Sequence, residues 1–301
     1  MSYLKPIVLS MRPRQWVKNF VIFAALVFSG RVFDATSQLV TAGGFVVFCL
    51  LSGAVYLFND LADVERDRAH PIKCKRPIPS GQLPEAVARR AVVVILALAF
   101  GGALALNLIS TTVGVDFAGI ALAYLVLQIA YSVHLKHVVI LDVMCIALGF
   151  VLRVVAGSAL LNVPASFWLI ACTSLLALFL GFGKRRHELE LLAEGAASHR
   201  KILQEYSTNF LDQMIALVTA ATVIAYSLYT MSEETIAHFG SAAAFLPLTI
   251  PFVIYGIFRY LYLVHHKQSG GSPTTTLLTD APILIDIALY FITVVVVLRY
   301  A

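Results

Sequence analysis

Long, nearly uninterrupted apolar runs are the feature that most limits what this chain can fold into. Of the 301 residues, 59% are hydrophobic and only 13% carry a formal charge, whereas soluble domains contain about 45–50% apolar and about 25% charged residues. A membrane-spanning helix needs about 20 mostly apolar residues, and a β-barrel would show short alternating strands instead. The runs therefore predict an all-α, polytopic membrane protein and exclude a soluble enzyme, a disordered chain and a disulfide-stapled secreted domain.

Hydropathy over windows of about 19 residues predicts nine transmembrane helices within one integral membrane domain over residues 1–301. These spans are 19–36, 38–58, 86–106, 115–133, 139–160, 165–182, 211–231, 244–264 and 282–300. The first span is the weakest, because Gly30, Arg31 and Asp34 interrupt it.

The distribution of basic residues predicts how the spans are oriented. Lys and Arg gather near the N-terminus and in alternate connections, and the intervening connections 107–114, 161–164 and 232–243 contain neither. Because cytoplasmic loops carry an excess of Lys and Arg, we expect an N-in/C-out topology. The cytoplasmic connections 59–85 and 183–210 are long and charged. Long ordered loops are usually functional, so we expect both to be catalytic loops of a cytoplasmic-face active site.

Two bulk properties exclude other functions. The net charge of +5 belongs to the membrane-proximal connections, so we do not expect nucleic acid as a partner. The four cysteines show no Cys-x-x-Cys spacing, so neither a zinc site nor a set of disulfides is predicted.

An acidic segment follows the second apolar run. Asp60, Asp63 and Asp67 are spaced i, i+3 and i+7, so on a helix they share one stripe. Like charges so placed repel one another unless a cation lies between them, and oxygen ligands favour Mg²⁺ completed by substrate phosphates. We predict a magnesium site formed by Asn59, Asp60, Asp63 and Asp67. The three aspartates are the predicted catalytic residues, and a solvated, charged helix end is the alternative.

A basic, stiff turn comes next, reading Lys73-Cys-Lys-Arg76-Pro-Ile-Pro-Ser-Gly81. Its prolines oppose helix formation, its glycine permits a tight backbone, and its cations suit phosphate. We predict that Lys73 and Arg76 bind the diphosphate of a metal-bound substrate. The alternative is an ordinary cytoplasmic loop whose charges only orient the chain.

The pattern Asn-Asp-x-x-Asp-x-x-x-Asp at 59–67, followed by Arg76-Pro77 and Gly81 on nine predicted spans, resembles the UbiA-type intramembrane prenyltransferase superfamily. The resemblance covers essentially the whole chain and implies a UbiA-like helical bundle. Members usually hold Mg²⁺-diphosphate with two Asp-rich motifs, the second after the sixth span. Here that segment, 183–190, reads Gly-Lys-Arg-Arg-His-Glu-Leu-Glu. It is basic where an acidic cluster is expected, and such a run suits a further phosphate rather than a second metal.

Further motifs resemble one branch of that superfamily, the decaprenyl-phosphate phosphoribosyltransferases. They are Arg12-Pro-x-Gln-Trp-x-Lys18-Asn19, Tyr131-Ser-x-x-Leu-Lys136, Leu141-Asp142-Val143, Lys184-Arg-Arg-x-Glu188-Leu and Tyr206-x-x-x-Phe-Leu-Asp212. The resemblance implies Mg²⁺-dependent transfer of 5-phosphoribose from phosphoribosyl diphosphate to a polyprenyl (decaprenyl) phosphate, with release of diphosphate. The product would serve the synthesis of cell-wall arabinan, and the protein would lie in a bacterial plasma membrane.

The same resemblance implies further substrate-binding residues beyond Lys73 and Arg76. They are Arg12, Lys18, Tyr131, Lys136, Asp142, Lys184, Arg185, Arg186, Glu188, Tyr206 and Asp212. We expect the Lys-Arg-Arg run to bind the ribose 5-phosphate or the lipid head group, and the sequence does not say which.

Ionisable residues inside the spans need a function or a partner, because charge at membrane depth is costly. Arg153 lies in the fifth predicted span, and we expect it to pair with Asp142 or with Asp286.

Two other functions stay open. The main alternative is a UbiA-type prenyltransferase that alkylates an aromatic or tetrapyrrole acceptor. A membrane transporter is less favoured, because the charges gather at one face instead of following the spans. The oligomeric state is also open, a homo-oligomer included.

Overall fold

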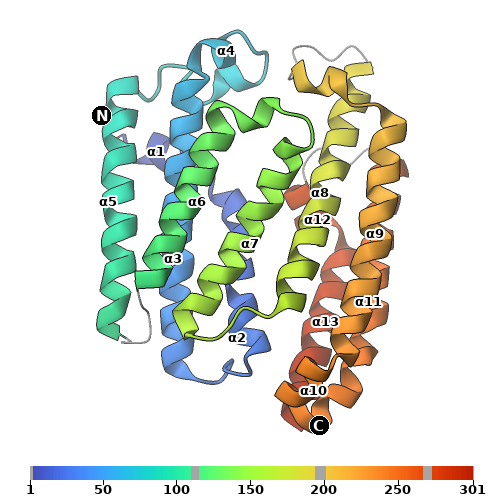
Figure 1. The fold of residues 1–301 in the computed structure, drawn as a ribbon. Coiled ribbons are helices and arrows are strands. Elements are labelled where there is room, and N and C mark those ends of the chain that lie inside the picture. The colour runs from blue at the N-terminus through green and yellow to red at the C-terminus, as the bar shows by residue number, and fades with distance from the viewer. Residues whose placement is uncertain (1–2, 110–114, 194–200, 267–272, 301) are drawn as a thin grey trace. The chain divides into compact units, whose positions relative to one another are not determined.

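The computed structural model describes residues 3–109, 115–193, 201–266 and 273–300, and all regular structure in these ranges is helical (Figure 1). The chain forms two compact units, Met1–Ala165 and Ser166–Ala301. The predicted all-α fold is therefore confirmed for the described residues.

The first unit contains seven α-helices and three 3-10 helices among its described residues. They are α1 (Leu4–Ser10), η1 (Pro13–Phe23), α2 (Ala24–Phe28), α3 (Ala35–Ala62), α4 (Val64–Arg68), η2 (Lys73–Lys75), α5 (Glu85–Ile109), α6 (Val115–Val133), η3 (Leu135–His137) and α7 (Leu141–Leu161).

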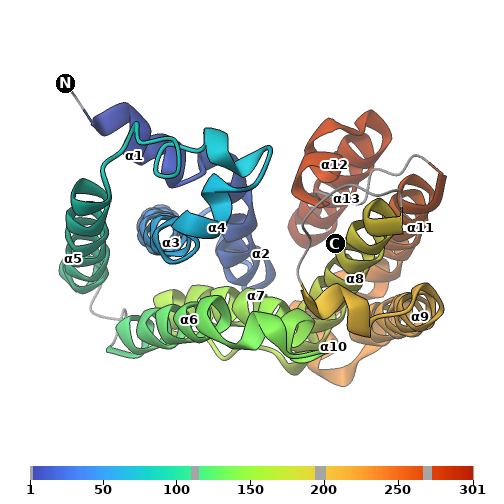
Figure 2. The ribbon, with the colours of Figure 1, turned by 90° about the horizontal axis from the view of Figure 1, so that it is seen from above.

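Helix α3 lies in the middle of the first unit, surrounded by α1, α5, α6, α7 and α2 (Figure 2). Its apolar side chains pack in two groups. One group lies around Phe48, whose ring is 5.2 Å from that of Tyr124 on α6. The other lies around Leu57 and includes Leu83. The second group is close to Asp60 in the sequence, so it fixes the part of α3 that carries the acidic residues.

Close packing of η1 on α7 depends on one glycine. A Cβ atom on Gly157 would lie 2.2 Å from the carbonyl oxygen of Ile22, a distance that no side chain can occupy. Because only glycine leaves this space, the 3-10 helix rests directly on α7.

The second unit contains six described α-helices and two 3-10 helices. They are α8 (Phe167–Ala193), η4 (Lys201–Glu205), α9 (Thr208–Met231), α10 (Glu233–Phe239), η5 (Gly240–Thr249), α11 (Ile250–His266), α12 (Pro273–Thr279) and α13 (Ala281–Tyr300). Within this unit α8 packs along α9, and α11 packs along α13. The hydroxyl of Tyr226 on α9 lies 2.7 Å from Thr249 Oγ1 and 3.1 Å from the hydroxyl of Tyr290, so it joins three elements.

Seven segments of the described chain are long and apolar enough to cross a membrane, which indicates a multi-pass membrane protein. They are Ala35–Ala62, Glu85–Ile109, Asp116–Val133, Leu141–Leu161, Phe167–Glu190, Thr208–Met231 and Glu233–His265. The predicted spans from the second to the eighth fall on these segments. The count of nine and the N-in/C-out orientation stay predictions.

The first and last predicted spans differ from the rest. At 19–36 the helical structure ends at Phe28, because Gly30 turns the backbone with φ +71. A new helix, α3, then begins at Ala35 after Asp34, whose Oδ2 accepts a hydrogen bond of 2.8 Å from the backbone N–H of Ser37, as an N-cap does. The last predicted span, 282–300, is α13, and its apolar part, Ala281–Val297, is shorter than the seven segments above.

The predicted loop 183–210 begins as a helix. Helix α8 continues to Ala193, so Lys184 to Glu190 lie on its final turns. No proline interrupts this stretch, and its Lys/Arg-to-Glu pairs at i+3 and i+4 support the helix. Residues 194–200 of the predicted loop lie outside the described residues.

Candidate active site

The acidic stripe lies where α3 ends and α4 begins. Asp60 is in the last turn of α3, Asp63 sits between the two helices, and Asp67 is on α4. Backbone hydrogen bonds from the N–H of Asp63 to Asn59 O and from the N–H of Asp67 to Asp63 O continue the helical course across this junction. The predicted stripe is thus present in the backbone.

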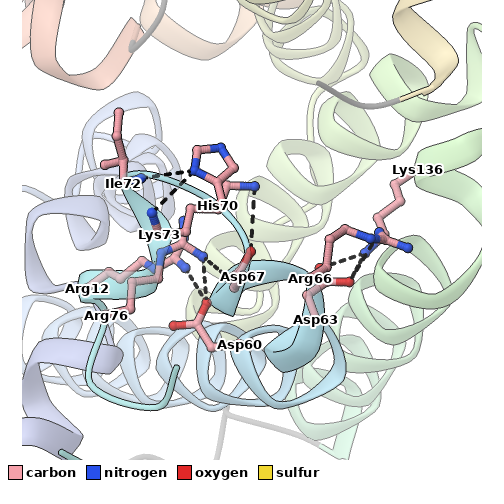
Figure 3. A network of polar contacts seen from close by, with 10 residues as sticks. All are labelled: Arg12, Asp60, Asp63, Arg66, Asp67, His70, Ile72, Lys73, Arg76 and Lys136. Atoms are coloured by element: carbon pink, nitrogen blue, oxygen red, sulfur yellow. Dashed lines mark hydrogen bonds and ion pairs between the residues drawn. The ribbon is translucent and has the colours of Figure 1, made fainter. Parts of the chain in front are cut away.

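Asp60 and Asp67 share one guanidinium group (Figure 3). Arg76 Nη1 lies 3.0 Å from Asp60 Oδ1 and 2.7 Å from Asp67 Oδ2. Arg12 Nη2 lies 2.5 Å from the same Asp60 oxygen, and Lys73 Nζ lies 3.7 Å from Asp67 Oδ1. Each aspartate is only 2% exposed. We call these five residues the acidic corner.

Asp63 faces different cations (Figure 3). Lys136 Nζ lies 3.0 Å from Asp63 Oδ2, and Arg66 Nη1 lies 3.6 Å from Asp63 Oδ1. Lys136 follows α6 in η3 and is buried. The structure therefore divides the predicted stripe into two carboxylate groups, each neutralised by basic side chains.

Local backbone structure positions the cations of the acidic corner. Arg12 adopts a left-handed conformation (φ 54, ψ 65) directly before Pro13, a costly geometry of the kind that clusters at functional sites. His70 Nδ1 accepts hydrogen bonds from the backbone N–H groups of Ile72 (3.1 Å) and Lys73 (3.4 Å). Gly81 has φ +79, which closes the turn after Arg76. The turn is therefore fixed at both ends.

The donor set fits a hard divalent cation only in part. In the described chain, no three His, Cys, Asp or Glu side chains gather closely enough to hold a metal ion by themselves. However, the Oδ1 atom of Asn59 is buried without a hydrogen-bond partner, and Asp60, Asp63 and Asp67 supply only oxygen. This matches Mg²⁺, which is usually bound through one or two carboxylates plus substrate phosphates rather than by an all-protein cage.

In the second unit, the predicted phosphate-binding run is paired with carboxylates. Arg185, fully buried, lies 2.6 Å from Glu188, and Lys184 lies 3.7 Å from the same residue. Arg186 lies 2.5 Å from both Glu190 and Asp212, the latter on α9. The run thus ties α8 to α9 within its own unit.

The remaining predicted residues are spread over both units. Lys18 lies on η1 and Tyr131 on α6, while Asp142 is fully buried in the first turn of α7. Tyr206 is buried after η4 and stacks on Phe210 with the ring centroids 6.0 Å apart.

The prediction that Arg153 pairs with Asp142 is wrong. Arg153 instead donates hydrogen bonds to Asn19 Oδ1 (2.8 Å), Gly149 O (2.7 Å) and the Tyr124 hydroxyl (2.7 Å). All three acceptors are neutral. The i, i+11 spacing of Asp142 and Arg153 along α7 separates the two side chains by three turns.

Tyr56 is a site residue that the sequence analysis missed. Its ring lies 4.8 Å below the Arg12 guanidinium, a cation–π contact that orients Arg12 toward Asp60. The i, i+4 spacing of Tyr56 and Asp60 on a helix was the available signal.

Comparison with known proteins gives the family. The model of the UbiA prenyltransferase family matches residues 19–272. The chain belongs to the UbiA prenyltransferase family. It is therefore a member of a family of transferases.

Curated relatives within the family carry a more specific name. The decaprenyl-phosphate phosphoribosyltransferase of Mycolicibacterium smegmatis is 37% identical over 75% of this chain and 70% of its own length. The protein of the same name from Corynebacterium glutamicum is 34% identical over 90% of this chain and 80% of its own length.

Solved structures show the same fold. The structure of a UbiA homolog from Archaeoglobus fulgidus bound to GPP and Mg²⁺ superposes on this chain with a TM-score of 0.68 and 18% sequence identity. The match covers 97% of this chain and 99% of the homolog. At this identity the likeness shows the fold alone.

Proposed function

We propose that this UbiA family member transfers 5-phosphoribose from phosphoribosyl diphosphate to a polyprenyl phosphate, of decaprenyl length in its relatives, and releases diphosphate. The reaction would take place at the cytoplasmic face of a bacterial plasma membrane and would supply precursors of cell-wall arabinan.

The acidic corner is the observation that carries the proposal. It combines two buried carboxylates with three cations, Arg12, Lys73 and Arg76. A metal-bound diphosphate needs both kinds of group, since carboxylates bind the metal and cations bind the phosphate oxygens. The names of the relatives at 34–37% identity support phosphoribose as the transferred group.

The proposed metal ligands are Asn59, Asp60, Asp63 and Asp67. A bound Mg²⁺ would draw charge from the departing diphosphate. Arg76 and Lys73 would bind diphosphate oxygens, and Arg12, which already contacts Asp60, would add a third positive charge beside them. Asp142, Tyr131, Tyr206 and the Lys184–Arg186 run with Glu188 and Asp212 are proposed to complete substrate binding.

The bond changes at the sugar need no proton transfer. The C1–O bond of the ribose breaks and its electron pair leaves with the diphosphate, while an oxygen of the lipid phosphate forms the new bond to C1. The lipid phosphate is already anionic near pH 7, so a general base is not required. Positioning and charge stabilisation by the corner residues would therefore dominate the rate.

A transfer assay tests the proposal. Purified protein in lipid nanodiscs is incubated with ribose-labelled phosphoribosyl diphosphate and decaprenyl phosphate, with Mg²⁺ or with EDTA. We expect Mg²⁺-dependent label in the organic phase. A parallel reaction with a prenyl diphosphate and 4-hydroxybenzoate tests the prenyltransferase alternative, and product in that reaction alone would overturn the proposal.

A further inference from the structure

Arg153 is a buried cation in the middle of a transmembrane helix. It lies on α7, within the span Leu141–Leu161, and is 6% exposed. Its guanidinium carbon lies 4.6 Å from the centre of the Tyr124 ring and 5.4 Å from that of Phe150. Together with the three hydrogen bonds described above, these contacts hold the guanidinium in one orientation.

Every group that holds Arg153 is uncharged. Within the described residues of the first unit, Arg153 forms no ion pair, and its hydrogen bonds use only three of its five N–H donors. A buried charge without a counterion costs several kcal/mol, and ionisable residues at membrane depth are usually functional. The site is therefore electrostatically suited to an anion that the described residues of the first unit do not supply.

Asn19 fixes the position of Arg153. Asn19 is fully buried, and its Oδ1 accepts from Arg153 Nε. Its Nδ2 lies 3.3 Å from both Cys49 Sγ and Ser52 Oγ on α3. Because both ends of the amide are occupied, the oxygen is held toward the guanidinium. An aspartate at this position would have nearly the same shape and would neutralise Arg153, yet the chain has the neutral amide.

Lys18 brings a second cation to the same place. It precedes Asn19 on η1, and Arg153 and Arg12 are the charges that act on it. Burial and these two arginines lower the pKa of Lys18 from 10.5 to about 8. No hydrogen bond or ion pair connects Lys18 to the described part of the chain. Neighbouring cations disfavour each other's charged form, and a bound anion would offset that repulsion.

We propose that Arg153 and Lys18, neither of them part of the acidic corner, form a subsite for a phosphate monoester and that Asn19 positions Arg153 in it. The inference rests on the proposed function, in which two phosphate monoesters bind: the 5-phosphate of the sugar donor and the head group of the lipid acceptor. Both present the same dianionic group, so the experiment must distinguish them.

Binding without turnover tests the subsite. Protein in detergent is titrated with ribose 5-phosphate and, separately, with farnesyl phosphate, and thermal unfolding is recorded. Ribose and farnesol are the uncharged controls. We expect one monophosphate to stabilise the protein more than its uncharged control does, and that one identifies the phosphate that uses the subsite.

Asn19→Asp is the decisive variant. The new carboxylate would neutralise Arg153 from within, so the midpoint of unfolding without ligand should stay equal or rise. The Kd of the responsive monophosphate should rise at least tenfold, as expected when a charged hydrogen bond worth about 1.5–3 kcal/mol is lost. Lys18→Met should weaken the same ligand, and Arg89→Met, which changes an exposed arginine on α5, should not.

The outcomes separate the subsite from the reaction. The proposed subsite is overturned if both Asn19→Asp and Lys18→Met bind the monophosphate as tightly as the wild-type protein does. It is also overturned if the wild-type protein binds neither monophosphate better than its uncharged control. If binding depends on these residues but the wild-type protein shows no phosphoribosyl transfer, the subsite stands and the proposed function fails.

Discussion

Lys136 Nζ lies 3.0 Å from Asp63 Oδ2, although the two residues are 73 positions apart in the sequence. The side chain of Lys136 is 7% exposed and that of Asp63 is 28% exposed. This ion pair fastens η3 to the end of α3, so the short connection after α6 forms part of the region around the acidic residues.

Replacing Lys136 should destabilise the first unit. Lys136→Met leaves Asp63 with only Arg66 among the described residues, an exposed partner at 3.6 Å. We expect a loss of about 2 kcal/mol in the free energy of unfolding, less than the roughly 3–5 kcal/mol seen when fully buried pairs are broken. Arg66→Met is the matched control and should cost less than about 1 kcal/mol. Thermal unfolding in detergent measures both effects. Equal losses in the two variants would contradict a stabilising role for the Lys136–Asp63 ion pair.

Asp67→Asn should remove turnover without unfolding the protein. The amide keeps the shape of the side chain but weakens its bond to Arg76 and its affinity for a metal. Loss of several kcal/mol of charge stabilisation predicts a fall in kcat/KM of about 100-fold or more. Glu65→Gln, which alters an 82% exposed carboxylate on the same helix, should keep the wild-type rate. Similar rates in the two variants would argue against a role for the acidic corner.

Arg76→Met should make stability depend on Mg²⁺. Without Arg76, Lys73 at 3.7 Å is the only basic partner of Asp67 in the part of the chain that the structure describes, and two buried carboxylates repel each other. We expect a lower unfolding midpoint in EDTA and a larger Mg²⁺-induced rise than in the wild-type protein, with NaCl of equal ionic strength as the reference. Arg68→Met, on the exposed face of α4, should behave as wild type. If the unfolding midpoint of the variant does not respond to Mg²⁺, the proposed metal site at the acidic corner is wrong.

Lys18 should make stability depend on pH. Its pKa in the folded protein is about 8, below the 10.5 of a solvated lysine, so between these values the unfolded chain binds more protons. The free energy of unfolding should therefore rise as pH increases from about 8 to about 10.5, and the same contribution is lost as pH falls through 8. The difference between the wild-type and Lys18→Met unfolding curves isolates this contribution, and parallel curves would contradict it.

Gly157→Ala should disrupt the packing of η1 on α7. The new methyl group would meet the backbone oxygen of Ile22 at 2.2 Å, and a backbone atom cannot move aside as a flexible side chain can. Overpacking of this kind costs about 1–3 kcal/mol. Gly101→Ala on α5, where nothing lies within 4 Å, should be neutral or stabilising. Unfolding midpoints of the two variants provide the comparison.

Hydropathy located most of the membrane helices because a long apolar run has few other stable structures in lipid. At 19–36 a left-handed glycine and an N-cap divide the run, and these are effects of single residues that a window average removes. At the site, i, i+3 and i+7 spacing predicted the backbone stripe. It could not predict that Asp63 binds Lys136 rather than sharing a cation with Asp60, because that depends on where the connection after α6 folds.

Arg153 shows a second limit of sequence reasoning. A charged residue in an apolar run indicates that a partner is needed, but it does not indicate which residue is the partner. The predicted pairing with Asp142, the nearest opposite charge in the sequence, was wrong. The actual partners are an amide from η1, a tyrosine from α6 and a carbonyl from its own helix. Neutral groups carry no signal that a charge-based search would detect.

One oxygen of Asp60 receives two guanidinium groups, one from Arg12 near the start of the chain and one from Arg76. Such duplication makes the carboxylate tolerant of losing either donor. A single substitution of Arg12 or Arg76 will therefore underestimate how much that arginine stabilises Asp60. The double replacement is needed to measure the coupling energy between the two arginines.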